Sequence, residues 1–121
     1  MSEKKSVLII NRTAPYGSSN AREALDVALT CSIFEMPVSL LYTDDGVYQL
    51  LNDQNPGAIA QKNLQALLSS LPMYDIDQIY ISETSANDKE LDLSDLSLPA
   101  QVVNSTEIAK LIQSHDTVLT F

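Results

Sequence analysis

The sequence predicts a three-layer α/β/α sandwich built around a five-stranded, mainly parallel β-sheet. Short apolar, β-branched runs typical of buried strands alternate with segments that carry apolar residues at helical spacing, and turn residues separate the two. Parallel neighbours need crossover connections, and helical crossovers cover both faces of the sheet. The chain has the usual size of one domain and shows no repeat or linker, so residues 1–121 are expected to form a single domain.

The first strand and helix are predicted within the first third of the chain. Ser6 to Ile10 is a continuous apolar run, which is typical of a central strand. After a turn-rich segment, Asn20 and Glu23 have the spacing of an N-cap residue and its return partner at a helix start. This helix is expected to continue to about Phe34.

The second strand is predicted after Pro37, which cannot continue the first helix. Val38 to Tyr42 is expected to form this buried strand, and a short helical segment through Val47 to Leu51 should follow it. A longer helix is predicted from Ile59 to Leu71, where leucine and isoleucine recur at three- and four-residue spacings and give one apolar face. Pro72 is expected to end this helix.

The third strand is predicted at Gln78 to Ser82, where Ile79 and Ile81 lie on one side. The next segment, Glu83 to Asp95, contains five acidic residues and one lysine, so it is expected to be a solvated loop.

The last quarter of the chain should complete the alternation. Ala100 to Val103 is predicted to be the fourth strand and Thr117 to Phe121 the fifth. Between them Asn104 and Glu107 repeat the capping spacing at the start of a last helix. The apolar face of that helix comprises Ile108, Leu111 and Ile112.

The charge balance argues against direct binding of nucleic acid. Seven basic residues stand against sixteen acidic ones, which gives a net charge of -9, and the basic residues are scattered along the chain. Proteins bind phosphate backbones through clustered Lys and Arg, so this surface is expected to repel a polyanion on average.

The same composition predicts a cytoplasmic protein that neither spans nor anchors to a membrane. The longest apolar runs are far shorter than the roughly 20 residues that cross a bilayer, and the first residues lack a secretory signal pattern. The single cysteine, Cys31, cannot form an internal disulfide, which suits a reducing compartment.

Two predicted loops could hold a ligand. Tyr16 to Asn20 leads into a helix start whose free amides could bind an anion, but it lacks a GxGxxG pattern and a Walker lysine, so a turn and cap is favoured. Asp44 and Asp45 could bind a metal or act as a general acid and base, yet adjacent side chains on an extended chain point in opposite directions. Asp45 followed by Gly46 is therefore interpreted as a tight turn, and no cofactor or metal is expected.

The thiol and the imidazole of this chain are not expected to form a catalytic set. Cys31 lies near the C-terminal end of the first predicted helix, away from the helix N-terminus that would stabilise a thiolate, so a partly buried packing role is favoured. His115, near the end of the last predicted helix, is interpreted as a C-terminal charge or cap, because the strand order places no Ser or Cys beside it.

Large apolar and aromatic side chains occur where loops are predicted, including Met73 and the last residue, Phe121. Such side chains are favoured at protein interfaces, and local packing under the loops is an equally weighted alternative. The residues expected at a partner interface are Tyr16, Asp45, Val47, Tyr48, Tyr74 and Phe121.

Several short motifs, taken together, resemble the TusC/DsrF family, which belongs to the DsrE/DsrF-like proteins. They occur in the same order and span nearly the whole chain. The matching pieces are Thr13 to Gly17, Arg22 to Asp26, Asp45 to Leu51, Gln54 to Pro56, Tyr74 to Ile76 and the aromatic Phe121. Each piece alone is weak, but the combination is specific to that family.

The resemblance implies a DsrEFH-like fold and a non-catalytic subunit of a sulfur relay. Members assemble with TusB-type and TusD-type subunits as a heterohexamer, a dimer of heterotrimers. The TusD-type subunit carries a persulfide cysteine that hands sulfur to a TusE-type carrier, toward 5-methylaminomethyl-2-thiouridine at the tRNA wobble position. That cysteine lies just after the third strand, where this chain has Ser82, and a hydroxyl cannot carry a persulfide.

Three alternatives remain open at the level of the sequence. A DsrF-like subunit would serve sulfur oxidation instead of tRNA thiolation, as the related DsrE-DsrF-DsrH assembly does. The chain could transfer sulfur itself through Cys31. It could also be an anion-binding module that uses the loop from Tyr16 to Asn20 and the turn at Asp45 and Gly46.

Overall fold

One parallel sheet forms the centre of the protein. The computed structural model describes residues 5–15, 19–51, 66–96 and 98–121. In these ranges five strands form a sheet with the order β4-β3-β2-β1-β5, and every pair of neighbours is parallel. The strands are β1 (Val7–Asn11), β2 (Val38–Tyr42), β3 (Gln78–Ser82), β4 (Gln101–Val103) and β5 (Thr117–Thr120). The predicted fold class is confirmed, and the described sheet is parallel throughout.

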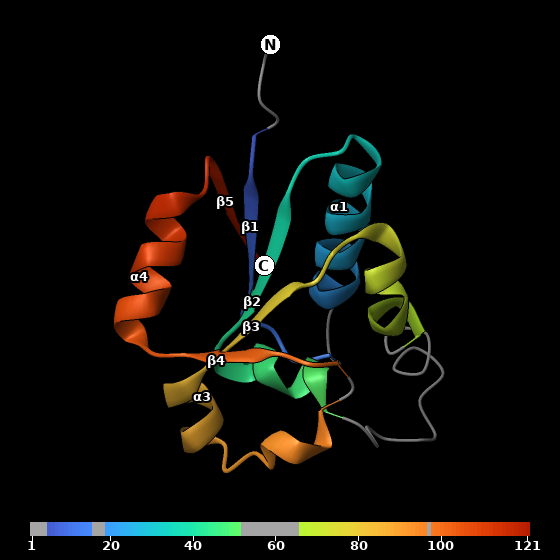
Figure 1. Ribbon diagram of the computed structural model, residues 1–121. Coiled ribbons are helices and arrows are strands. Elements are labelled where there is room, and N and C mark those ends of the chain that lie inside the picture. The colour runs from blue at the N-terminus through green and yellow to red at the C-terminus, as the bar shows by residue number, and fades with distance from the viewer. Residues whose placement is uncertain (1–4, 16–18, 52–65, 97) are drawn as a thin grey trace.

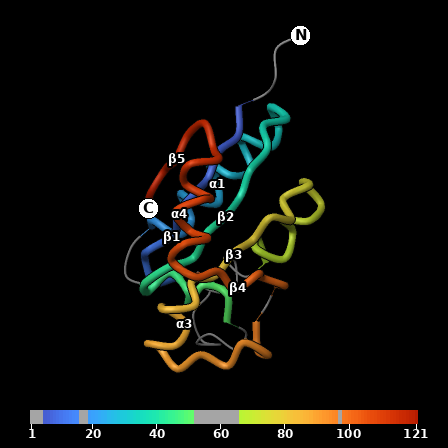
Figure 2. Tube along the Cα trace, turned by 60° about the vertical axis from the view of Figure 1, so that its left-hand side comes forward, coloured from blue at the N-terminus to red at the C-terminus, as the bar shows by residue number. Residues whose placement is uncertain are grey.

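Helices cover both faces of this sheet (Figure 1). On one face lie α1 (Asn20–Ile33) and the helical residues 66–70, and on the other lies α4 (Ser105–Ser114). At the end where the strands finish, α3 (Glu83–Asp88) and the 3-10 helix η1 (Asp44–Leu50) close the sheet, as both Figure 1 and Figure 2 show. In the described ranges, no helix has the length and apolar character that a bilayer span requires.

The two faces of the sheet contribute unequally to the core. On the α1 face, Ile9, Leu40 and Ile81 belong to one large buried cluster. On the α4 face the buried cluster is small, and α4 itself has no buried residue. Full burial of a leucine-sized side chain contributes about 1.5–3 kcal/mol, so most hydrophobic stabilisation comes from the α1 side.

The predicted second long helix is described only at its C-terminal end. Residues 66–70 are helical and a 3-10 helix, η2 (Leu71–Tyr74), continues from them with Pro72 in its first turn. This confirms that the α-helix ends before Pro72. The predicted start of the helix at Ile59 lies outside the described residues.

One of the two predicted helix caps is confirmed. At α4, the Asn104 side chain accepts a hydrogen bond from the Glu107 amide at 2.9 Å, and the Glu107 carboxylate accepts one from the Asn104 amide at 3.0 Å. At α1 the prediction was wrong, because Asn20 is already helical and Ser19 is the N-cap. Glu23 therefore pairs with Ser19 instead of Asn20: the Ser19 hydroxyl donates a hydrogen bond to Glu23 Oε1 at 3.1 Å.

The prediction of a loop from Glu83 to Asp95 was also wrong. This segment contains α3 and a second short helix, η3 (Leu93–Asp95). Local side chains cap both helices: Ser82 accepts from the Ser85 amide and Asp92 from the Ser94 amide. Such caps satisfy free amides at helix starts and so favour short helices even in an acidic, exposed segment.

His115 caps α4 as predicted, but it also has a serine partner that the strand order did not reveal. Its Nδ1 lies 2.6 Å from the Leu111 carbonyl oxygen, and its Nε2 lies 2.9 Å from Ser39 Oγ on β2. Because a carbonyl only accepts, Nδ1 donates this hydrogen bond, and in the neutral imidazole Nε2 then accepts from the Ser39 hydroxyl. This arrangement joins the C-terminal end of α4 to the amino end of β2.

Asp116 joins the amino ends of β1 and β5, and its carboxylate should contribute to stability in a pH-dependent way. Oδ2 accepts hydrogen bonds from the Ser6 amide at 2.8 Å and from the Ser6 hydroxyl at 3.2 Å. The Ser6 amide, followed by the hydroxyl, lowers the pKa of Asp116 below its ordinary value of 3.8. A lowered folded-state pKa stabilises the protein above the unfolded-state pKa, and this stabilisation is lost as pH falls through the folded-state value.

We therefore expect Asp116→Asn to flatten the fall in unfolding free energy at acid pH. Urea denaturation from about pH 6 to about pH 2.5 would measure this effect, which should begin near pH 4 where an unfolded aspartate titrates. Asp88→Asn removes a carboxylate from the surface of α3 and is the control. Equal flattening by both variants would contradict a specific role for Asp116.

Candidate functional site

The carboxyl ends of the strands are where parallel α/β sheets usually bind ligands, and η1 and α3 cover them here. The two helices contact each other directly. The Asp44 amide at the start of η1 donates a hydrogen bond to Ser85 Oγ in α3 at 2.9 Å. The segments that follow β2 and β3 are therefore joined at this end of the sheet, where exposed acidic residues of both helices give a polar surface: Asp44, Asp45, Glu83 and Asp88.

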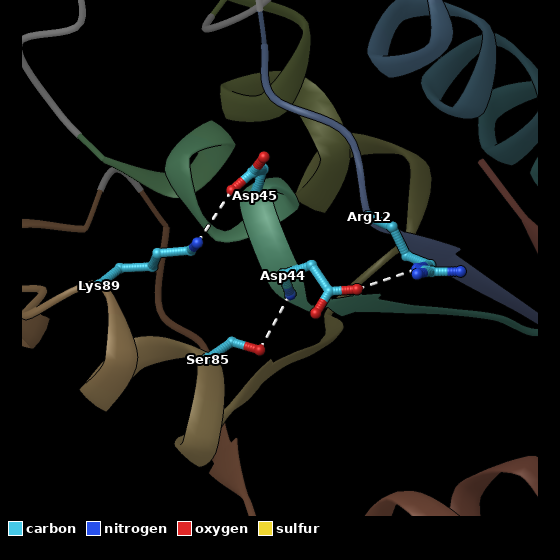
Figure 3. A network of polar contacts seen from close by, with 5 residues as sticks. All are labelled: Arg12, Asp44, Asp45, Ser85 and Lys89. Atoms are coloured by element: carbon cyan, nitrogen blue, oxygen red, sulfur yellow. Dashed lines mark hydrogen bonds and ion pairs between the residues drawn. The ribbon is translucent and has the colours of Figure 1, made fainter.

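Two ion pairs extend this surface (Figure 3). Arg12 Nε lies 2.9 Å from Asp44 Oδ2, and Lys89 Nζ lies 3.0 Å from Asp45 Oδ1. The hydrogen bond from Lys89 to Asp45, with their attraction, raises the pKa of Lys89 above its ordinary 10.5. Exposed ion pairs add little stability, so they mainly orient these side chains.

The two aspartates do not converge on a common point. Asp44 faces Arg12, whereas Asp45 faces Lys89 on the other side of η1 (Figure 3). In the described ranges, no three His, Cys, Asp or Glu side chains lie close enough together to hold a metal ion.

Position 46 requires a glycine because η1 packs closely against the end of β1. A Cβ atom at Gly46 would lie 2.0 Å from the carbonyl oxygen of Asn11, which is far inside contact distance. The same oxygen accepts a hydrogen bond from the Thr43 amide at 3.0 Å. The predicted tight turn at Asp45 and Gly46 is therefore the first turn of a 3-10 helix, and the left-handed residue is Asp44, with φ of 49°.

Ser82 lies at the predicted place, as the last residue of β3. It is 5% exposed, and its Oγ accepts a hydrogen bond from the Ser85 amide at 3.2 Å, which makes it the N-cap of α3. Hydrogen bonds thus link Ser82 through Ser85 to Asp44. The hydroxyl has a structural partner at the position where the family resemblance places a sulfur carrier.

Ser82→Ala should lower the unfolding free energy by about 1 kcal/mol, the usual loss when a capping hydroxyl is removed. Chemical denaturation at neutral pH would measure it. Ser105→Ala, at an exposed helix position of α4, is the matched control and should change stability less. Equal losses would show that the Ser82 cap contributes nothing specific.

Cys31 lies at the opposite end of the sheet from Ser82. It is in the last turn of α1, half-buried and packed against the main core, as predicted. Its carbonyl accepts a hydrogen bond from the Met36 amide at 3.1 Å, and the carbonyl of Pro37, next along the chain, accepts one at 2.9 Å from the amide of Val7, the first residue of β1. The structure therefore does not bring Cys31 to the position of the missing thiol.

The described residues that were predicted at a partner interface lie on η1, on η2 and at the end of the chain. Val47 was wrongly predicted at that interface: it is 0% exposed and belongs to the main core, because η1 packs its apolar side onto the sheet end. Asp45 is exposed and Tyr48 half-buried on the same helix, while Tyr74 is 44% exposed before β3. Phe121 packs partly against the main core. Tyr16 lies outside the described residues.

Sequence reasoning missed two buried polar side chains in the main core region. Among the residues that the structure describes, the Tyr42 hydroxyl at the end of β2 and Oε1 of Gln49 in η1 have no hydrogen-bond partner. Burial raises the pKa of Tyr42 far above its usual value, so this phenol stays neutral. The sequence carried no signal for either, since Tyr42 is part of an apolar run and Gln49 follows a turn.

A match to a protein-family model shows to which family this chain belongs. The model of the DsrE/DsrF-like family matches residues 5–121. The chain belongs to the DsrE/DsrF-like family. This confirms the family inferred from the order of the short motifs.

Individual proteins match this chain over nearly their whole length. A protein TusC homolog from Pseudomonas aeruginosa is 40% identical and covers 96% of this chain and 98% of its own. The intracellular sulfur oxidation protein DsrF from Allochromatium vinosum is 32% identical, with 97% and 96% covered. The crystal structure of the YchN protein from E. coli superposes with a TM-score of 0.83 at 25% identity, covering 97% of this chain and 99% of that one.

Proposed function

We propose that this chain is a non-catalytic subunit of a TusBCD-type sulfur-relay complex that supports 2-thiolation of the wobble uridine in tRNA. The observation that carries the proposal is the 40% identity to a protein TusC homolog over 96% of this chain. An identity of this level, spread over the whole fold, favours a shared place in an assembly more than a shared fold alone.

The side chain at the end of β3 supports the non-catalytic part of this proposal. A relay thiol must be present as a thiolate and reachable by its donor and acceptor. Ser82 is buried, carries no sulfur and caps α3 instead. Cys31 supplies the chain's one thiol at the other end of the sheet, half-buried against the core.

The proposed partners are a TusB-type and a TusD-type subunit, in a cytoplasmic heterohexamer that meets a TusE-type carrier indirectly. The persulfide cysteine would then belong to the TusD-type subunit. The net charge of -9 supports a role in which other components hold the tRNA, because an acidic surface repels phosphates. The polar surface formed by η1 and α3 is the proposed region for shaping the catalytic neighbourhood.

Co-expression with both partners tests the assembly. We expect the three chains to co-purify and to give the mass of a dimer of heterotrimers by light scattering. Purification of this chain alone as a monomer, with neither partner bound, would overturn the subunit proposal.

Sulfur loading tests the non-catalytic role in the same complex. After incubation with a labelled persulfide donor, we expect label on the TusD-type subunit and none on this chain, by intact-protein mass spectrometry. Cys31→Ala should leave the transfer rate to a TusE-type carrier unchanged, because no relay step uses this thiol. Label on the wild-type chain that disappears in Cys31→Ala would establish a sulfurtransferase instead.

A second candidate is a DsrF-like subunit that serves sulfur oxidation. It is favoured by the 32% identity to the A. vinosum DsrF protein over 97% of this chain. Deleting the gene and measuring 2-thiouridine in hydrolysed tRNA separates the two. Loss of the thiolated nucleoside supports the tRNA role, whereas normal thiolation with impaired oxidation of reduced sulfur supports the second candidate.

A further inference from the structure

The amino ends of the strands carry an exposed apolar patch, at the opposite end of the sheet from Ser82. Six large apolar side chains are exposed in the described part of the chain, and four of them lie on α1, its C-cap or η2. These four, Ile33, Phe34, Met73 and Tyr74, are 69%, 64%, 85% and 44% exposed, and we call them the amino-end patch. Single exposed apolar residues are common, but α1 and η2 pack against each other and so bring these four residues to one end of the sheet, as expected of a contact surface.

A cavity of about 330 Å³ lies beside the amino-end patch. Its walls come from the turn that joins α1 to β2 and from the segment that joins η2 to β3, which includes Tyr74 and Ile76. Figures 1 and 2 both place these two turns at the amino end of the sheet. This volume is at the lower end of the range of ligand pockets, about 300–1,000 Å³, and it can also hold one large side chain of a partner.

Both walls of this cavity are fixed by backbone hydrogen bonds. In the first turn Met36 donates to the Cys31 carbonyl at 3.1 Å, and in the second Ile76 donates to the Leu71 carbonyl at 3.1 Å. Each turn holds one acidic residue in the left-handed region, Glu35 and Asp75, both with φ of 61°. The cavity is therefore pre-formed, which lowers the entropy lost when a partner binds.

The charges around the cavity select the kind of partner. Glu35 and Asp75 line it, and its described lining includes no basic residue. A second copy in a two-fold contact would bring the same carboxylates toward each other, on a chain that already carries a net charge of -9. Opposite charge across an interface steers association and suppresses wrong partners, so the complementary partner is a different protein with basic residues.

We propose that the amino-end patch docks another subunit of the relay complex. The contacting segment of that subunit inserts a large apolar or aromatic side chain into the cavity and places Lys or Arg opposite Glu35 and Asp75. This inference rests on the proposed function, since it takes the partner to be a subunit of the same complex. Residues with these properties dominate binding energy at many interfaces.

The test compares assembly of the wild-type chain and of Phe34→Asp/Met73→Asp with the TusB-type and TusD-type subunits. Both side chains are mostly exposed, so the isolated variant should keep its fold, which circular dichroism checks. We expect its affinity for the partners to fall by about tenfold or more, because two exposed apolar side chains of the amino-end patch become charged. Leu93→Asp/Ile112→Asp, at the other two exposed apolar positions, is the matched control and should assemble like wild type.

A charge variant keeps the proposal testable even if the first variant misfolds. Glu35→Gln/Asp75→Asn changes little shape, and it should weaken assembly and reduce its dependence on salt concentration. Unchanged affinity and unchanged salt dependence would overturn the inference.

The remaining outcomes separate this inference from the proposed function. If the wild-type chain binds neither subunit, both are wrong. If the wild type assembles and the Phe34→Asp/Met73→Asp variant assembles as tightly, only the docking surface is wrong. If the isolated wild type forms a dimer that this variant abolishes, the occupant is a second copy and the inference is likewise overturned.

Discussion

Val47→Arg is expected to leave the chain largely unfolded instead of weakening its contacts with a partner. Val47 is 0% exposed and packs in the main core together with Leu50 from the same helix. An arginine there would need either a buried charge without a partner or the detachment of η1, and an unpaired buried charge costs about 3–5 kcal/mol. Natural domains have a total stability of about 5–15 kcal/mol, so this loss removes much of it.

Far-UV circular dichroism and urea denaturation of the isolated chain would measure this effect. Tyr48→Arg is the matched control, because the adjacent side chain on η1 is only half-buried and the arginine head can reach water. Tyr48→Arg should lower the unfolding free energy clearly less than Val47→Arg does. A Val47→Arg chain with wild-type stability would contradict the burial described for η1.

Gly46→Ala is the second change with a large expected effect. The added methyl would overlap the Asn11 carbonyl, which is backbone and is already bonded to the Thr43 amide. Relief requires η1 to shift away from the end of β1, and overpacking of this kind typically costs about 1–3 kcal/mol. Thermal denaturation should therefore give a lower midpoint.

Asp45→Ala, one residue away, provides the control for this substitution. It removes the exposed ion pair with Lys89 and adds no atoms, so it should change stability little. If Gly46→Ala were as stable as Asp45→Ala, η1 would not be held against β1 as closely as described.

The strands were predictable from sequence because buried strands have a recognisable pattern of apolar residues. Val38–Tyr42 and Gln78–Ser82 have the predicted bounds, since strands covered on both faces, or alternating on one, carry continuous or alternating apolar residues. Both parallel pairing and the helical crossovers then followed from the alternation along the chain. The end of β3 at Ser82 was predictable for the same reason.

The arrangement at the ends of the sheet was not predictable, because it depends on contacts between distant segments. Val47 follows a turn signal in the sequence, and its side chain is in the core because η1 packs against the sheet end, where Gly46 approaches Asn11. The Ser39 partner of His115 comes from an element 76 residues away. The helix α3 has six residues, too few for a clear periodicity, and its start depends on the Ser82 cap.

Helix α4 covers its face of the sheet without a single buried side chain, and this affects which part of the molecule opens first. Ile108 and Leu111 pack only partly against the sheet, so the helix depends on its two polar ends, the Asn104 cap and the hydrogen bond between His115 and Ser39. Regions with few buried contacts open locally at a lower free energy than the whole protein. The amides of α4 should therefore exchange with solvent hydrogen through opening of this layer, while β1 and β2 stay closed.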